Sequence, residues 1–112
     1  MIKTYNKLVR NNIPMTIEES GKEVKYHRMT KGEYQEQLRL KLIEEVNEFV
    51  IAPTKKEMVN EMADILTVLE AIQTEFKIDS FEVSMEKIFK DRVNGTFTQK
   101  YCLESVEEKD SK

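Results

Sequence analysis

Two long stretches of helical periodicity, joined by a very short link, are the feature that most constrains how this chain can fold. The first begins at residue 31 or 32 and continues to 51, where Pro53 prevents it from going further. The second covers residues 54–76, with Thr54 as its N-cap and Glu57 in a capping-box relation to it. A link this short makes two long helices antiparallel neighbours. The sequence therefore predicts an antiparallel helix pair as the centre of the fold.

The rest of the chain predicts an all-α antiparallel helical bundle with a short extended N-terminal arm. Residues 1–14 form this arm, because Pro14 disfavours helix at the residue before it. Further expected elements are a helical turn over residues 16–20, a short strand over residues 24–28, and a third long helix over residues 80–93 that Gly95 terminates.

Length and composition limit the number of domains, the kinds of partner and the cellular compartment. The 112 residues, 39% of them hydrophobic, fit a single domain over residues 1–104, followed by a charged tail over 105–112 that we expect to be disordered. The net charge is -3 and acids alternate with bases, so no nucleic-acid polymer is expected as a partner. No apolar run is long enough to cross a membrane, and the lone Cys102 cannot form an internal disulfide. We expect a soluble, cytoplasmic protein.

Two pairs of carboxylates on the two long helices predict a metal site. Glu45 with Glu48, and Glu61 with Asp64, are each spaced three residues apart, so the members of each pair point in similar directions. On adjacent helices the four would converge, and a cation would relieve their mutual repulsion. Oxygen-only ligands suit Mg²⁺, with Mn²⁺ as the other choice, whereas zinc or copper would favour His or Cys.

The apolar pattern supports this site and also predicts self-association. On the first helix Glu45 falls inside the stripe expected to face inward, while Glu44 points away from it. A carboxylate among leucines is costly unless it is paired or ligated. The second helix is apolar around much of its circumference, which indicates a second packing partner and hence a homodimer or homotetramer. The inward stripe of the first helix comprises Leu38, Leu42, Val46 and Phe49.

The stretches KLIEEVNEF (41–49) and NEMADILTVLEAI (60–72) resemble the Glu-x-x-Glu and Glu-x-x-Asp signature of a known family. This family is the all-α nucleoside triphosphate pyrophosphohydrolases, the MazG-like and phosphoribosyl-ATP pyrophosphohydrolase-like group. Two flanking stretches are similar to one branch of it: KLVRNNIP (7–14) to its Lys-Leu-Val-Arg-Asp-x-Ile-Pro opening, and VNGTF (93–97) to its Arg-Gly-Gly-Phe segment. The resemblance implies Mg²⁺-dependent hydrolysis of a nucleoside triphosphate to a monophosphate and pyrophosphate, often as house-cleaning of non-standard nucleotides, by a dimer or tetramer.

When the family's motif is matched to this sequence position by position, the resemblance implies that the metal ligands are Glu45, Glu48, Glu61 and Asp64. It also implies that substrate phosphate meets Lys41, together with Lys7 and Arg10 of the opening motif. Two departures concern substrate choice: Asn11 stands where the branch has Asp, and Val93 with Asn94 stand where it has Arg-Gly. The nearest cations to that second departure are Lys90 and Arg92, which are candidate substrate-binding residues or simply complement the C-terminal end of their helix.

The expected reaction is attack by water on a phosphoanhydride bond, with Glu48 or Glu45 taking the proton from that water. Two alternatives stay open at this point. Acidic pairs on exposed helices can serve only to solvate a helix face, and the departures from the motif allow a non-catalytic helical interaction or regulatory protein that keeps the bundle. The sequence does not name the base or sugar of the nucleotide, the number of metal ions or the general base.

Overall fold

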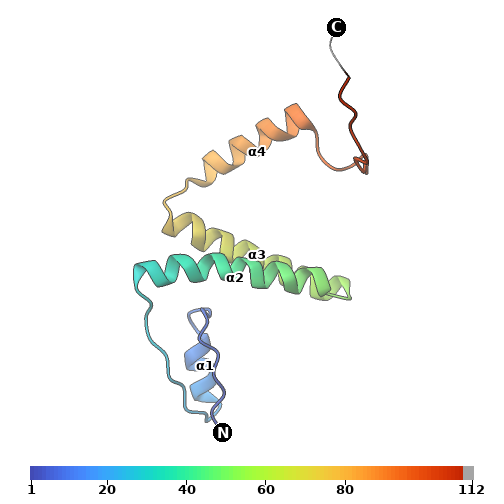
Figure 1. The fold of residues 1–112 in the computed structure, drawn as a ribbon. Coiled ribbons are helices and arrows are strands. Elements are labelled where there is room, and N and C mark those ends of the chain that lie inside the picture. The colour runs from blue at the N-terminus through green and yellow to red at the C-terminus, as the bar shows by residue number, and fades with distance from the viewer. Residues whose placement is uncertain (110–112) are drawn as a thin grey trace. The chain divides into compact units, whose positions relative to one another are not determined.

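The computed structural model describes residues 1–109 of the chain and contains four α-helices in this part (Figure 1). The residues divide into two compact units, Met1–Asp79 and Ser80–Lys112. The prediction of one domain over residues 1–104 is not tested by this division. The first unit holds α1, α2 and α3, and the second holds α4. The helices are α1 Ile13–Glu19, α2 Lys31–Ile51, α3 Lys55–Glu75 and α4 Ser80–Asn94.

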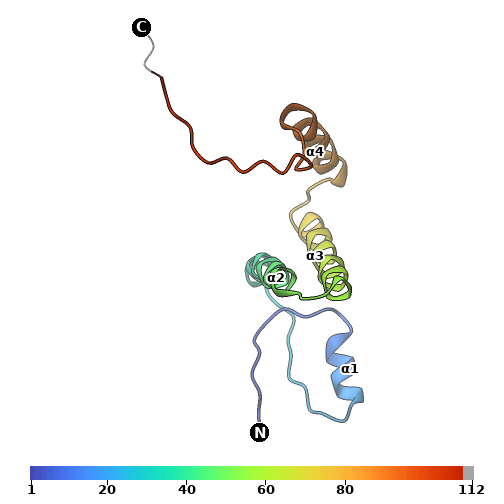
Figure 2. The ribbon, with the colours of Figure 1, turned by 90° about the vertical axis from the view of Figure 1, so that its right-hand side faces the viewer.

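The predicted pair of long antiparallel helices is confirmed as α2 and α3, which lie side by side in both views (Figures 1 and 2). Each begins with a threonine cap. The Thr30 hydroxyl accepts a hydrogen bond from the backbone N–H of Glu33 at 3.3 Å, and the Thr54 hydroxyl accepts one from Glu57 at 3.2 Å. These caps satisfy backbone donors that the first helical turn leaves unpaired.

The N-terminal third of the chain differs from the prediction in two places. Helix α1 begins at Ile13, before the expected helical turn over residues 16–20, because Pro14 occupies its first turn. Proline suits that position, since its fixed φ is helical and its missing N–H has no helical partner there. Residues 24–28 were expected to form a strand, which is wrong, because they are irregular in the structure. These residues have no neighbouring strand to pair with in the part of the chain described.

The buried centre of the first unit lies between α2 and α3 and is small. Leu38 of α2 is 2% exposed and Val68 of α3 is 9% exposed. At the end of the pair where α2 begins and α3 finishes, the Gln35 side chain donates a hydrogen bond to Glu75 at 3.1 Å. One acidic side chain, Glu45, shares this centre at 8% exposure. Two helices in contact thus position the only strongly buried carboxylate among the described residues.

The second unit consists of α4 and an irregular segment after it. The backbone N–H of Gly95 bonds to the carbonyl of Asp91 at 3.0 Å, and Gly95 has a φ of +81°. Glycine adopts this left-handed conformation without a Cβ clash, so the predicted terminator of this helix is confirmed. Residues 105–109 of the predicted tail form no helix or strand, while 110–112 lie outside the described residues. Within the described part, no helix is both long and apolar enough to span a membrane.

Candidate metal centre

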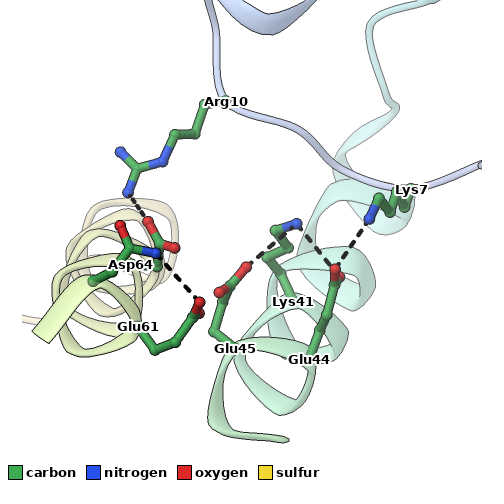
Figure 3. A network of polar contacts seen from close by, with 8 residues as sticks. Lys7, Arg10, Lys41, Glu44, Glu45, Glu61 and Asp64 are labelled. Carbon is green, nitrogen blue, oxygen red and sulfur yellow. Dashed lines mark hydrogen bonds and ion pairs between the residues drawn. The ribbon is translucent and has the colours of Figure 1, made fainter. Parts of the chain in front are cut away.

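Three carboxylates converge where α2 and α3 face each other (Figure 3). Glu45 comes from α2, while Glu61 and Asp64 come from α3. One oxygen of each residue lies within 4.8 Å of one oxygen of each of the others. We call these three residues the acidic triad. The triad joins side chains from both helices of the antiparallel pair, as the carboxylate spacing predicts.

Helical phase explains why these three carboxylates meet. Glu45 follows the buried Leu38 by seven residues, which is two turns, so both lie on the same face of α2. Glu61 and Asp64 precede the buried Val68 by seven and four residues, so all three share one face of α3. The contact between α2 and α3 therefore brings the acidic triad together along with the apolar centre.

Burial and neighbouring carboxylates raise the pKa of Glu45. Burial contributes most, followed by the hydrogen bond it shares with Glu61 and the negative charge of Asp64. Lys41, whose Nζ lies 3.6 Å from a Glu45 oxygen, opposes this shift only in part. Lys41 thus compensates only part of the negative charge around Glu45, the most buried member of the triad.

A second carboxylate of α2, Glu44, lies beside the acidic triad and is held by two lysines. Lys7 of the N-terminal arm approaches one of its oxygens at 3.1 Å, and Lys41 approaches the other at 3.4 Å. Burial alone would raise the pKa of Glu44, but the hydrogen bonds and charges of Lys7 and Lys41 outweigh it and hold that pKa below its ordinary value. Glu44 therefore stays ionised and anchors the two lysines.

The N-terminal arm also reaches α3. An Nη atom of Arg10 lies 2.6 Å from the Oδ1 atom of Asp64, although the two residues are 54 positions apart in sequence. Figure 3 shows Arg10 beside α3 and Lys7 beside α2. Lys7, Arg10 and Lys41 thus surround a group of four carboxylates, which leaves one negative charge in excess. The sequence singled out these three cations. Arg10 and Lys41 contact members of the triad, and Lys7 contacts Glu44 beside it.

Three further residues were predicted to belong to the site. Glu48 is exposed on α2 and is not a member of the acidic triad. Lys90 and Arg92 lie on α4, which belongs to the second unit. The assignments of all three residues stay predictions.

Two contacts at the site were not predicted from the sequence. Glu44 was expected to point away from the inward stripe, either into solvent or next to the metal ligands, and its pairing with a lysine 37 positions earlier in the chain was not foreseen. The Asn60 side chain donates a hydrogen bond to Glu61 at 3.3 Å. The sequence signal for Glu44 was its place three residues after Lys41, a spacing that allows an ion pair on one helix. Nothing in the sequence pattern distinguished Asn60.

The donor set of the acidic triad fits a hard divalent cation. Three carboxylate oxygens are suitable ligands for Mg²⁺ or Mn²⁺. Ligands of an octahedral Mg²⁺ are about 3.0 Å apart when adjacent and about 4.2 Å apart when opposite, so side-chain rotations would have to bring the triad oxygens, which lie within 4.8 Å of one another, closer together. A cation there would also relieve the repulsion that raises the pKa of Glu45. These residues could hold a metal ion.

Comparison with known proteins adds no relative on which to base a function. No protein-family model matches this chain, and searches of curated proteins and of solved structures found no match. The structure itself supports an all-α protein with an acidic cluster that could hold a metal ion.

Proposed function

We propose that this protein is a Mg²⁺-dependent nucleoside triphosphate pyrophosphohydrolase that releases a nucleoside monophosphate and pyrophosphate. The observation that carries the proposal is the acidic triad on two antiparallel helices, bordered by Lys7, Arg10 and Lys41. The resemblance of residues 41–49 and 60–72 to the pyrophosphohydrolase signature supports the same reaction. House-cleaning of non-standard nucleotides is the role that this resemblance implies.

The charge around the site favours an anionic substrate once a divalent cation is bound. The four carboxylates and three cations leave one negative charge in excess, so a divalent cation would turn that excess positive. A polyphosphate is the substrate class that gains most from such a change in sign. When bound, Mg²⁺ supplies neutralisation of phosphate charge and a lower pKa for an attacking water.

In the proposed reaction, water attacks the anhydride linkage between the α- and β-phosphates. The bond to the pyrophosphate leaving group breaks, and the proton of the water passes to a carboxylate. Glu48 is the first candidate for this base, because it is exposed one turn beyond Glu45 and is not committed to the acidic triad. Glu45 is the second candidate. Lys41 is placed to balance phosphate charge.

The direct test is a panel of standard and modified nucleoside triphosphates assayed with Mg²⁺, with both products identified. We expect monophosphate and pyrophosphate in equal amounts, and no turnover after the metal is removed by a chelator. Release of inorganic phosphate and a nucleoside diphosphate would contradict the proposed bond cleavage. If no triphosphate is hydrolysed with Mg²⁺ or Mn²⁺ and neither metal raises the unfolding temperature, the non-catalytic helical protein is the better description.

We also propose that the bundle is completed by a second copy of the chain. Four exposed apolar residues of α3 repeat at intervals of three and four, and helical phase places this stripe on the side away from the buried Val68. Exposed apolar surface of this regularity is typical of a helix with a second packing partner. Val46, which was expected to face inward, is also 41% exposed. The stripe comprises Val59, Met62, Leu66 and Leu69.

Replacing Leu66 with Glu is expected to convert the oligomer to a monomer, because a charge in the centre of an apolar interface would be buried without a partner. Light scattering on a sizing column measures the change. Thr67→Glu is the matched control, since Thr67 is also exposed but lies about 100° around the helix from Leu66. A monomeric wild-type protein at micromolar concentration would contradict the proposal.

A further inference from the structure

We infer that the N-terminal arm is a strap that positions the acidic triad for metal binding, with Arg10 as the positioning residue for Asp64. The inference rests on the proposed function for the presence of a metal. It gives Arg10 a different task from the phosphate contact that the sequence suggests. Its starting point is the 2.6 Å contact between Arg10 and the Oδ1 atom of Asp64.

The strap is attached to both helices that build the triad. Lys7 binds Glu44 of α2 at 3.1 Å, and Arg10, three residues later, binds Asp64 of α3 (Figure 3). Leu8, between them, is half-buried. Each attachment spans a large separation in sequence, 37 and 54 positions. The arm therefore connects α2 to α3 at the level of the acidic triad.

The backbone of the arm is itself fixed on both sides of these two cations. Asn6 has a φ of +47°, which turns the chain immediately before Lys7, and asparagine tolerates this left-handed conformation better than most residues. The carbonyl of Arg10 accepts a hydrogen bond from the backbone N–H of Ile13, the first residue of α1, at 3.1 Å. Arg10 is thus presented to Asp64 from an ordered turn.

Arg10 can orient Asp64 without occupying all of its ligand capacity. A carboxylate has two oxygens and about four lone-pair directions, and Arg10 contacts only Oδ1. Hydrogen bonds from neighbouring groups to a ligating carboxylate fix its direction, and their loss typically lowers metal affinity about 10–100-fold. The contact is also largely exposed, so it contributes little to the stability of the fold. Metal affinity is therefore the property that Arg10 should change most.

The test is Mn²⁺ binding, measured by calorimetry, on the full chain and its variants. We expect Arg10→Ala to weaken Mn²⁺ binding by about 10-fold or more, with little change in the unfolding midpoint of the chelated protein. Arg10→Lys should restore part of the affinity, because it keeps a cation able to donate to Asp64. The control is Lys3→Ala, which removes a cation of the same arm that lies over the Tyr5 ring, and it should leave affinity unchanged.

Hydrogen exchange gives an independent readout on metal-free protein. Arg10→Ala and Lys7→Ala should both speed exchange of the Ile13 amide, whose N–H donates to the Arg10 carbonyl at 3.1 Å, whereas Lys3→Ala should not. Unchanged or tighter Mn²⁺ binding in Arg10→Ala would overturn the inference, since tighter binding means that Arg10 competes with the metal. If Arg10→Ala does not fold, Lys7→Ala decides, with weaker Mn²⁺ binding expected and unchanged binding contradicting the strap. If the wild-type protein binds no Mn²⁺, the proposed metal centre is rejected together with the strap. If the wild type hydrolyses triphosphate but both variants bind Mn²⁺ as tightly as the wild type, only the strap is rejected.

Discussion

Asp64→Asn is expected to reduce Mg²⁺-dependent triphosphate hydrolysis by about 100-fold or more, equivalent to at least about 2.7 kcal/mol of transition-state stabilisation. The substitution keeps the shape of the side chain and removes one negative charge from the acidic triad. It also weakens the contact with Arg10, but exposed ion pairs contribute at most about 1 kcal/mol, so the fold should survive. Initial rates of pyrophosphate release measure the effect.

The control for this experiment is Glu70→Gln, which removes a carboxylate from an exposed position of the same helix outside the triad. Its rate should equal that of the wild type. Thermal unfolding with and without millimolar Mg²⁺ completes the test, because a ligand that binds only the folded state raises its stability. We expect the Mg²⁺-dependent rise in wild type and in Glu70→Gln, and none in Asp64→Asn. Undiminished hydrolysis by Asp64→Asn would refute the proposed metal centre.

Glu45→Leu is expected to abolish hydrolysis and at the same time to stabilise the chelated protein by about 1–2 kcal/mol. Glu45 is 8% exposed, and its burial and its acidic neighbours raise its pKa, so the ionised carboxylate is unfavourable in the folded state. A leucine would instead extend the apolar face that contains Leu38. Lys41 would keep its contact with Glu44. Urea unfolding in the presence of a chelator measures the difference.

The stabilisation of the chelated protein by Glu45→Leu should change with pH in a defined direction. Because the folded-state pKa of Glu45 lies above the ordinary value of 4.5, its protonated form is favoured in the folded protein. The contribution of Glu45 to stability is therefore present below pH 4.5 and is lost as the pH rises through the folded-state pKa. Glu45→Leu should therefore raise the free energy of unfolding by more at pH 7 than at pH 4. Glu36→Leu, at an exposed position of α2, is the control, and equal stabilisation by it would contradict the explanation.

The sequence predicted the α2 and α3 elements well because the signals for their ends are local. Thr54 and Pro53 act on backbone groups within a single turn, so their effect is readable without the rest of the molecule. The start of α1 was misjudged because Pro14 both disfavours helix before it and favours the first turn of a helix. The strand over residues 24–28 failed because strand formation depends on a neighbouring strand, and local alternation does not supply one.

For the candidate site, the sequence supplied the residue types and the tertiary structure supplied their grouping. The three-residue spacing of Glu61 and Asp64, and the position of Glu45 in an apolar stripe, could be read directly because helical phase is regular. The sequence made both Glu45 and Glu48 candidate ligands, with Glu45 inside the apolar stripe and Glu48 at its border, and only Glu45 belongs to the acidic triad. A separation of three residues is close to a full turn but not equal to one, and the crossing of α2 over α3 decides which of the two falls between the helices.

The sequence by itself determined the two long helices, their antiparallel pairing and a surplus of carboxylates on their facing sides, because capping, helix breaking and periodicity are local properties of the chain. Only the tertiary structure decided which carboxylates meet and which cations accompany them. Arg10 and Asp64 are 54 positions apart, and no periodicity relates an irregular arm to a helix surface. That contact depends on where the arm turns at Asn6 and where α1 begins, and therefore on packing and backbone geometry in three dimensions.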